Sequence, residues 1–402
     1  MSKRILPEIS VIGYGCITAA GATSLASWDA LQQRRVNNKI IPSIFEAPCF
    51  YVDEENSTFQ VLSKSDLRPH NRTISLALFA IDEALYQAGL TLEDLRGKRV
   101  GLALGTTVGN TFHNEAYYMQ WENGEIPDPA PLHQYFDNNL ALYIQRLLGI
   151  NGPRVVITNA CASGTDAIGL AKIWLEQGLC DLAIAGGADA LSRVACNGFK
   201  SLRLIAGESC RPFDKNRQGL NPGEAAGVFI MERDEQSDHK KLSLGFVKGY
   251  GIAGDAFHPT APHPQGRGLQ LAIRAALLDA QINRQDICMI NAHGTGTPSN
   301  DIAETQAVFE AGIDPSVPMV STKGITGHTL GAAGGVEAVL TLLTLNHGHI
   351  IGTVGCTHPD PLLNFPVIPE AESQALAGII GISQSLAFGG SNSVLIIEGG
   401  AQ

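Results

Sequence analysis

The stretch TNACASGTDA, residues 158–167, joins two segments of different character. The residues before it, RVVI at 154–157, are apolar and β-branched, which is typical of a buried strand. The residues after it, AIGLAKIWLEQG, carry apolar side chains at helical spacing. Cys161 therefore lies where a strand passes into a helix, and the small residues beside it allow a sharp turn there.

The same alternation of strand and helix continues along the chain. Apolar runs predict strands at 8–15 and 99–106, and RTISLALFAIDEALYQAGL (72–90) shows the spacing of one helix face, with Gly89 as its stop. Residues 107–150 read as an irregular, aromatic-rich loop. The second half repeats the theme, and its strands are also apolar on both faces. This pattern predicts an α/β fold.

Two segments can be laid over each other. Residues 155–178 and 318–348 both read as a strand, a small-residue loop and an Ala- and Leu-rich helix that ends at glycine. Such self-similarity indicates an internal duplication. The polar run ERDEQSDHKKLS between the halves predicts a boundary near residue 240, giving units 1–240 and 241–402.

Composition excludes several classes of protein. Hydrophobic residues make up 44% of the 402 residues and charged residues 17%, which is a globular composition. The formal net charge of −11 argues against nucleic acid as a partner. We expect no signal peptide and no membrane span, because no apolar run is long enough. Eight cysteines without a CxxC pair predict neither a zinc knuckle nor a disulfide framework, and favour the reducing cytoplasm.

Cys161 is the first candidate for chemistry. The start of a helix offers unpaired N–H groups and the positive end of the dipole, and both favour a thiolate over a thiol. The predicted turn has the geometry of a nucleophile elbow with sulfur in place of oxygen. The alternative is a buried structural cysteine, the commoner fate of this residue.

Three further segments place polar groups at strand ends. NAHGTGTPSND (291–301) contains His293, and STKGITGHTLGAAGG (321–335) contains Lys323 and His328. Sites in open α/β sheets gather at the carboxyl ends of strands, so we expect these side chains to meet Cys161. In SLAFGGSN (385–392) a backbone N–H could form an oxyanion hole with that of Cys161, unless the loop is an ordinary tight turn.

The four motifs ACASG, NAHGTGTP, KGITGHTLGAAGG and FGGSN, in this order, resemble those of the β-ketoacyl-acyl carrier protein synthases, condensing enzymes of the thiolase superfamily. The resemblance covers nearly the whole chain. It implies a duplicated thiolase-like fold of five layers, α-β-α-β-α, and a homodimer or a heterodimer with a chain-length-factor-like ketosynthase. The substrates would be carried on the phosphopantetheine of an acyl carrier protein, with no free cofactor.

The resemblance also implies roles. Cys161 would hold the acyl group as a thioester, His293 and His328 would act on the malonyl extender as it decarboxylates, and Lys323 would support the His328 side. The backbones of Cys161 and Phe388 would form the oxyanion hole, and the Phe388 ring would gate the acyl pocket. The substrate-binding residues would be Thr295 and Thr297 for the pantetheine arm, Val108 and Phe199 for the acyl pocket, and Tyr135 and Phe136 at the end of a partner's acyl tunnel.

Departures from the family pattern add three expectations. Asp166 replaces the histidine of housekeeping fatty-acid enzymes, which looks more like type II polyketide ketosynthases. Gln384 replaces the asparagine beside Ser383 that accompanies a structural cation near Asn291 and Glu337, so we expect no metal. An acidic carrier needs a local basic patch on this acidic chain, for which the candidates are Lys64, Arg68, Arg72, Lys200 and Arg203.

The leading hypothesis is therefore a decarboxylative condensing enzyme of fatty acid, polyketide or aryl polyene synthesis. The alternative is a non-catalytic chain-length partner subunit, which would keep the fold without the nucleophile. A thiolase that uses coenzyme A is disfavoured, because residues 376–402 lack a second catalytic cysteine.

Overall fold

The computed structural model describes residues 7–53, 58–64, 67, 71–109, 114–137, 139–234 and 243–400. Arg68 and the predicted boundary at residue 240 lie outside these ranges.

Ten strands form one mixed sheet that consists of two equivalent halves. The first half contains β1 (Ile9–Thr18), β4 (Val100–Gly105), β5 (Arg154–Ile157), β6 (Leu182–Asp189) and β7 (Ala225–Arg233). The second half contains β8 (Gly245–Gly254), β9 (Met289–Asn291), β10 (Met319–Val320), β13 (Ile380–Ala387) and β14 (Ser391–Gly399). In both halves the spatial order is first, fifth, fourth, second and third strand. The identical order confirms the internal duplication.

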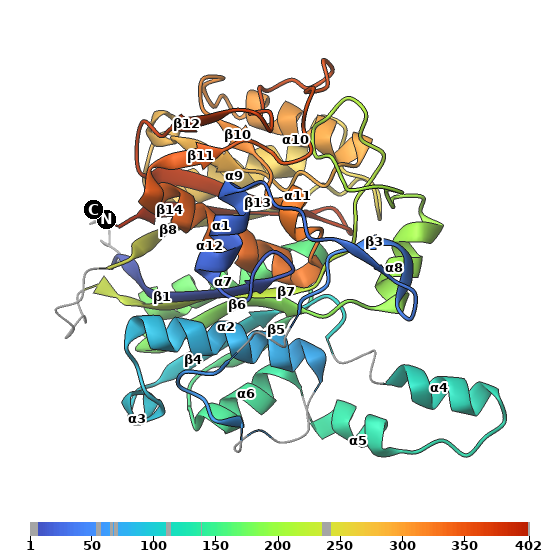
Figure 1. Cartoon of the computed structure of the whole chain (residues 1–402). Coiled ribbons are helices and arrows are strands. Elements are labelled where there is room, and N and C mark those ends of the chain that lie inside the picture. The colour runs from blue at the N-terminus through green and yellow to red at the C-terminus, as the bar shows by residue number, and fades with distance from the viewer. Residues whose placement is uncertain are drawn as a thin grey trace.

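Helices complete the five layers (Figure 1). Helices α7 (Ser163–Glu176) and α12 (Ala333–His347) lie between the two halves of the sheet and contact strands of both. Helices α2 (Arg72–Ala88) and α6 (Leu140–Leu148) cover the outer face of the first half, and α9 (Arg267–Ala280) and α10 (Pro298–Glu310) that of the second. The predicted α/β thiolase-like fold with α-β-α-β-α layers is confirmed.

A glycine pair in each half allows the outer helix to approach the sheet. Gly13 and Gly15 of β1 face α2, and Gly249 and Gly251 of β8 face α9. At each of the four, a Cβ atom would lie within 2.3 Å of a helix carbonyl oxygen. Both pairs belong to a Gly-Tyr-Gly tripeptide, which is a second sequence trace of the duplication.

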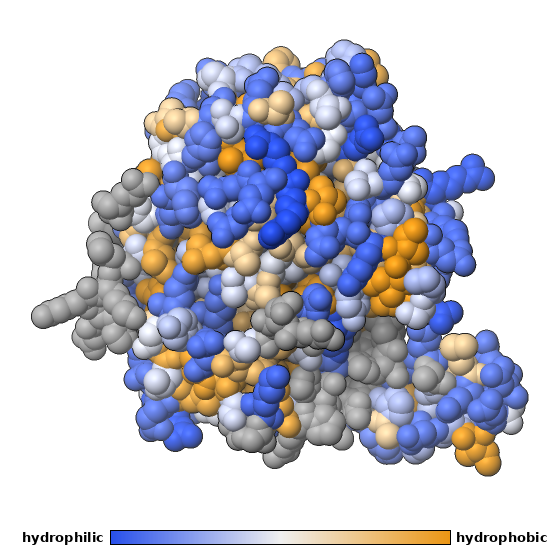
Figure 2. Space-filling view, in the orientation of Figure 1, coloured by the Kyte–Doolittle hydropathy of each residue, from blue (hydrophilic) through white to orange (hydrophobic). Residues whose placement is uncertain are grey.

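The expected irregular loop at 107–150 is wrong in part. Besides α6, it contains α4 (Glu115–Glu122) and α5 (Ala130–Asp137), which project from the body as an arm. Figure 2 shows hydrophobic atoms at the outer end of this arm. Tyr118, Met119 and Trp121 of α4 and Ile126 after it are exposed. Helix α4 has no apolar stripe, so its sequence gave no helical periodicity to detect.

The remaining elements are short. They are α1 (Ser24–Gln32), β2 (Lys39–Ile41), β3 (Phe45–Cys49), α3 (Leu92–Leu95), α8 (Arg193–Ser201), α11 (Lys323–Thr326), β11 (His349–Ile351) and β12 (Ser373–Ala375). Within the described ranges, no helix has the length and apolar character needed to cross a membrane. All eight cysteines are buried free thiols.

Candidate active site

Cys161 lies in a strained turn between β5 and α7. The turn is a 3₁₀ helix over Ala160–Ala162, and Ala160 takes the left-handed φ of +45°. Ser163 braces the turn, because its hydroxyl donates to the Ala160 carbonyl over 2.6 Å and accepts the Asn159 N–H over 2.8 Å. The duplicated turn before α12 has the same form, with Leu330 at φ +54°. The predicted elbow is therefore present.

The small residues around Cys161 also serve the packing of the two central helices. A Cβ on Gly164 would come within 2.8 Å of the Gly335 nitrogen, and one on Gly334 within 2.0 Å of the Thr165 hydroxyl. The starts of α7 and α12 therefore touch backbone to backbone. This contact places the Cys161 elbow against the loop that carries His328.

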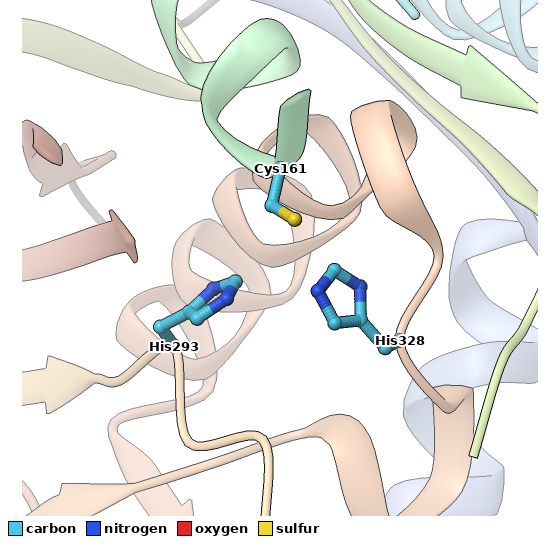
Figure 3. A group of neighbouring side chains, drawn as sticks. All are labelled: Cys161, His293 and His328. Carbon is cyan, nitrogen blue, oxygen red and sulfur yellow. The ribbon is translucent and has the colours of Figure 1, made fainter. Parts of the chain in front are cut away.

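The two histidines converge on the cysteine (Figure 3). The Sγ atom of Cys161 and one ring nitrogen of each of His293 and His328 all lie within 4.8 Å of one another. The two imidazoles are edge to face, with centroids 5.2 Å apart. His293 follows β9 and His328 precedes α12 in the second half, whereas Cys161 follows β5 of the first, so both halves contribute to one site. The predicted grouping of the three residues is present.

The hydrogen bonds of the histidines determine which nitrogen carries the proton. Nδ1 of His328 accepts the backbone N–H of Leu330 over 3.1 Å. Nδ1 of His293 faces Nζ of Lys323 over 3.2 Å, and an ammonium can only donate. Both neutral rings therefore carry their proton on Nε2. A metal ion bound at Nε2 would push that proton onto Nδ1, where it would face a donor, so the residues do not fit a metal.

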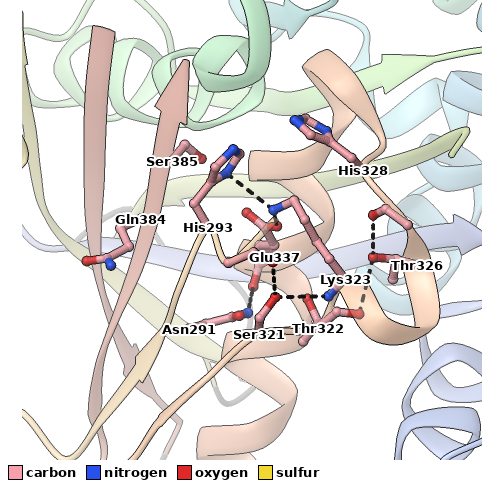
Figure 4. Close-up of polar contacts among 12 residues, drawn as sticks. Asn291, His293, Ser321, Thr322, Lys323, Thr326, His328, Glu337, Gln384 and Ser385 are labelled. Carbon is pink, nitrogen blue, oxygen red and sulfur yellow. Dashed lines mark hydrogen bonds and ion pairs between the residues drawn. The ribbon is translucent and has the colours of Figure 1, made fainter. Parts of the chain in front are cut away.

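Lys323 supports His293, and the prediction that it supports the His328 side is wrong. Its ammonium forms a buried ion pair with Glu337 of α12 as well as the bond to His293 (Figure 4). Lys323 and His293 are 30 positions apart, so the sequence does not show that they pair. The pair fixes a positive charge beneath the two imidazoles.

Burial controls the protonation of the site. It lowers the pKa of His328 to about 3 and that of His293 well below its usual value, with the charge of Lys323 acting in the same direction. Both rings are thus neutral at physiological pH. Burial also raises the pKa of the Cys161 thiol to about 12, against the effects of Lys323 and the Phe388 N–H. The helix start alone does not produce a resting thiolate, contrary to the sequence prediction.

Comparison with known proteins identifies this arrangement. The N-terminal domain of the beta-ketoacyl synthases matches residues 7–237, and their C-terminal domain matches residues 244–357. The chain belongs to the β-ketoacyl synthase family. It is 30% identical to the 3-oxoacyl-[acyl-carrier-protein] synthase 2 of Staphylococcus aureus (strain N315), over 99% of this chain and 98% of the relative. As a member of this family it is an acyltransferase that catalyses a condensation.

Two solved structures are also similar. The ishigamide ketosynthase/chain length factor gives a TM-score of 0.90 at 30% identity, covering 98% of this chain and 100% of that one. The ketosynthase ApeO in complex with its chain length factor ApeC, from Xenorhabdus doucetiae, gives 0.83 at 29% identity, covering 98% of each chain.

A cleft leads from the surface of this ketosynthase to Cys161. Its lining includes Thr295 and Thr297, whose hydroxyls are 2.8 Å apart, and the Phe199 and Phe388 rings, 5.8 Å apart. Val108 packs beside the Phe199 ring in a small apolar cluster. Their roles toward pantetheine and the acyl chain stay predictions. The sequence analysis missed further members of the lining or cluster, namely Leu204, Leu220 and Leu330.

The predicted docking residues differ in their exposure and in their ion pairs. Arg72 pairs with buried Glu224 over 2.5 Å and lies over the Tyr51 ring, which leaves 28% of its side chain exposed. Lys200 and Arg203 are exposed beside α8, although Lys200 faces Glu46 over 3.7 Å. Lys64 is also exposed. Arg68 lies outside the described residues.

The expected tunnel residues lie on the projecting arm. Phe136 of α5 is 75% exposed, so it touches little of its own chain. Tyr135 is in the same helix, but its side chain lies outside the described residues.

Two buried carboxylates missed by the sequence analysis hold the active-site loops. Glu304 of α10 accepts the N–H groups of His293 and Gly294, over 2.5 and 2.8 Å. Asp189 accepts the Gly331 N–H over 2.7 Å and the Thr107 N–H over 2.6 Å. Neither belongs to a motif that marks chemistry. Their only sequence signal is an acidic residue within an apolar strand or helix face.

The residues near Asn291 do fit a structural cation. The side-chain oxygens Asn291 Oδ1, Ser383 Oγ and Glu337 Oε2 are buried and lack a hydrogen-bond partner among the described residues. Asn291 and Ser383 are neighbours across β9 and β13, so they share the face toward α12. Gln384 points to the other face, where its amide donates to Glu304 over 2.8 Å. The substitution at Gln384 therefore does not remove these oxygen ligands, contrary to our expectation.

Proposed function

We propose that this ketosynthase transfers an acyl group from an acyl carrier protein to Cys161 and condenses it with a malonyl group on a second carrier. The observation that carries the proposal is the meeting of a buried cysteine with two neutral histidines whose Nε2–H groups are free to donate. A nucleophile and a pair of donors are the two requirements of the reaction.

The first step is acyl transfer. The Cys161 sulfur, having lost its proton, attacks the carbonyl carbon of the acyl thioester, and the oxyanion accepts the backbone N–H groups of Cys161 and Phe388. The bond from that carbon to the pantetheine sulfur then breaks. The departing pantetheine sulfur takes up the proton that Cys161 lost, so the step consumes and releases no net proton. Each N–H of such a hole contributes about 10²- to 10³-fold in rate.

The second step is decarboxylation of the malonyl group. The bond to the carboxylate breaks, carbon dioxide leaves, and the electron pair moves to the thioester oxygen. That oxygen accepts the Nε2–H groups of His293 and His328. The resulting carbanion attacks the acyl carbon on Cys161, a carbon–carbon bond forms, and the bond to Cys161 breaks. The Cys161 thiolate then takes up a proton.

These steps require no free cofactor, because the substrates are held on the carrier's pantetheine, for which Thr295 and Thr297 line the cleft. Asn291, Ser383 and Glu337 would hold a structural cation, which would supply a fixed positive charge. We also propose two units, 1–240 and 241–402, because the sheet repeats its strand order after β7.

The free cysteines favour the cytoplasm as the location of this protein.

The protein works as a dimer in this proposal. The matched solved structures include ketosynthases paired with chain length factors, and the projecting arm of α4 and α5 exposes Trp121 and Phe136. An identical chain or a chain-length-factor-like subunit would cover this arm. The route is fatty acid, type II polyketide or aryl polyene synthesis.

Mass spectrometry tests the function. The purified chain is incubated with acyl carrier proteins that bear different acyl groups, alone and with malonyl carrier. We expect one acyl group on Cys161, none on Cys161→Ala, and a β-ketoacyl carrier with malonyl. A chain that binds a ketosynthase but never becomes acylated would instead be a non-catalytic chain-length partner, the alternative that the intact Cys161, His293 and His328 disfavour.

A further inference from the structure

Asp166 is a buried carboxylate that the proposed chemistry does not use. It lies in the first turn of α7 and is 6% exposed. One oxygen accepts the Tyr250 hydroxyl over 2.8 Å and the Ser393 hydroxyl, and the other accepts the Asn159 amide over 2.6 Å. No lysine or arginine forms an ion pair with Asp166 in the described part of the chain. All the hydrogen-bond donors to this carboxylate are therefore neutral groups with a defined direction.

The donors come from the two sides of the oxyanion hole. Asn159 opens the turn that holds Cys161, and its amide also donates to the Ser391 hydroxyl over 2.8 Å. Ser391 and Ser393 begin β14, directly after the loop that carries Phe388. The two N–H groups of the hole therefore belong to different halves of the duplicated chain, and Asp166 is bonded to the supports of both.

Tyr250 anchors the same carboxylate to the second half-sheet. Its ring packs so closely on Gly169 of α7 that a Cβ there would lie 2.3 Å from it. Its backbone N–H donates to Asp279 over 2.9 Å, and Asp279 pairs with Lys172 of α7 over 2.8 Å. Helix α7 is thus fixed against β8 at Asp166 and at the next two turns, through Gly169 and Lys172.

We propose that Asp166 is a positioning residue, which sets the distance between the backbone N–H groups of Cys161 and Phe388 by joining the Asn159 turn to the start of β14. The inference rests on the proposed function, in that Cys161 is the acylated residue. Loss of the carboxylate would leave three donors without an acceptor and let the Phe388 loop move relative to Cys161. One of the two N–H groups would then lie too far from the oxyanion to donate a good hydrogen bond.

The test compares two reactions of Cys161 in Asp166→Leu. Acylation by an acyl-pantetheine thioester passes through an oxyanion, whereas alkylation by iodoacetamide does not. We expect kcat for acylation to fall about 10²-fold, the effect of losing one oxyanion donor, with alkylation within about threefold of wild type. Asp166→Asn should recover most of the rate, because its carbonyl can accept the Asn159 amide while its own amide donates to the two hydroxyls.

Asp82→Leu is the matched control. Asp82 is also a buried carboxylate with three donors, the backbone N–H groups of Gln60, Val61 and Leu62, but it lies on the outer helix α2. It should lose stability and keep the acylation rate. Where Asp166→Leu fails to fold, Ser393→Ala removes one donor and should slow acylation about fivefold without changing alkylation.

Equal losses in acylation and alkylation, or a normal acylation rate in both Asp166→Leu and Ser393→Ala, would overturn the inference. Failure of the proposed function looks different, because the wild-type chain itself would then show no acylation of Cys161.

Discussion

Nζ of Lys323 lies 3.2 Å from Nδ1 of His293, and the same ammonium is paired with Glu337. This contact makes Nε2 of His293 the protonated nitrogen and aims its N–H into the cleft. Lys323 is therefore a positioning residue for one of the two donors to the enolate.

Lys323→Met should reduce decarboxylation more than acylation. Without the ammonium, Nδ1 can carry the proton and Nε2 ceases to donate, a loss on the order of 10²-fold. Acylation of Cys161 should fall much less, because its oxyanion uses backbone N–H groups. Release of carbon dioxide from malonyl carrier, measured beside acyl-enzyme formation, separates the two. Equal losses in both would contradict the assignment.

The histidines should behave as a pair of donors. In His293→Ala and in His328→Ala we expect condensation to fall about 10²-fold or more, with the Cys161 acyl-enzyme still formed. His328→Gln offers an amide donor near the position of Nε2 and should recover part of the rate. Normal carbon dioxide release in both alanine variants would show that neither ring stabilises the enolate.

The fold and the grouping of Cys161, His293 and His328 could be predicted from the sequence, because each depends on local pattern. The alternation of strand and helix, the strand ends at Cys161 and His293, and the duplicated small-residue turns are all local. The partner of Lys323 could not be predicted. Lys323 contacts His293 rather than His328, although His328 is nearer in the sequence. This contact depends on how β9 and α12 pack in the second half-sheet.

The burial of individual side chains also could not be predicted from the sequence. The sequence shows a cysteine at a helix start and so predicts a thiolate, but burial raises the pKa of this thiol to about 12. The partner of Arg72 could not be predicted either. Its charge reads as a surface cation, yet the folded chain places it against Glu224, which is fully buried.

Carrier docking should depend on the exposed cations near α8. Lys200→Glu combined with Arg203→Glu reverses two charges and should raise the apparent KM for carrier-bound substrate several-fold, with the effect shrinking in high salt. Turnover of small pantetheine thioesters should be nearly unchanged. Arg99→Glu, at the exposed surface pair with Asp181, is the control and should affect neither substrate. An equal loss with carrier-bound and small substrates would mean that the two residues support the site itself.

The depressed pKa of His328 predicts how stability changes with pH. In the folded chain this ring has a pKa of about 3, whereas an unfolded histidine titrates near 6.5. Between these values the unfolded chain binds a proton that the folded chain does not, so the free energy of unfolding falls as the pH is lowered.

His328→Gln removes this contribution and leaves the other titrating groups in place. Between pH 7 and pH 4.5 the wild-type chain should therefore lose roughly 2–3 kcal/mol more stability than the variant, since each pH unit in the window is worth about 1.4 kcal/mol. Urea unfolding at both pH values measures the difference. Activity should show no acid limb near pH 6.5 from this ring, because it is already neutral there. A variant that loses as much stability as the wild type would mean that His328 is protonated in the folded site.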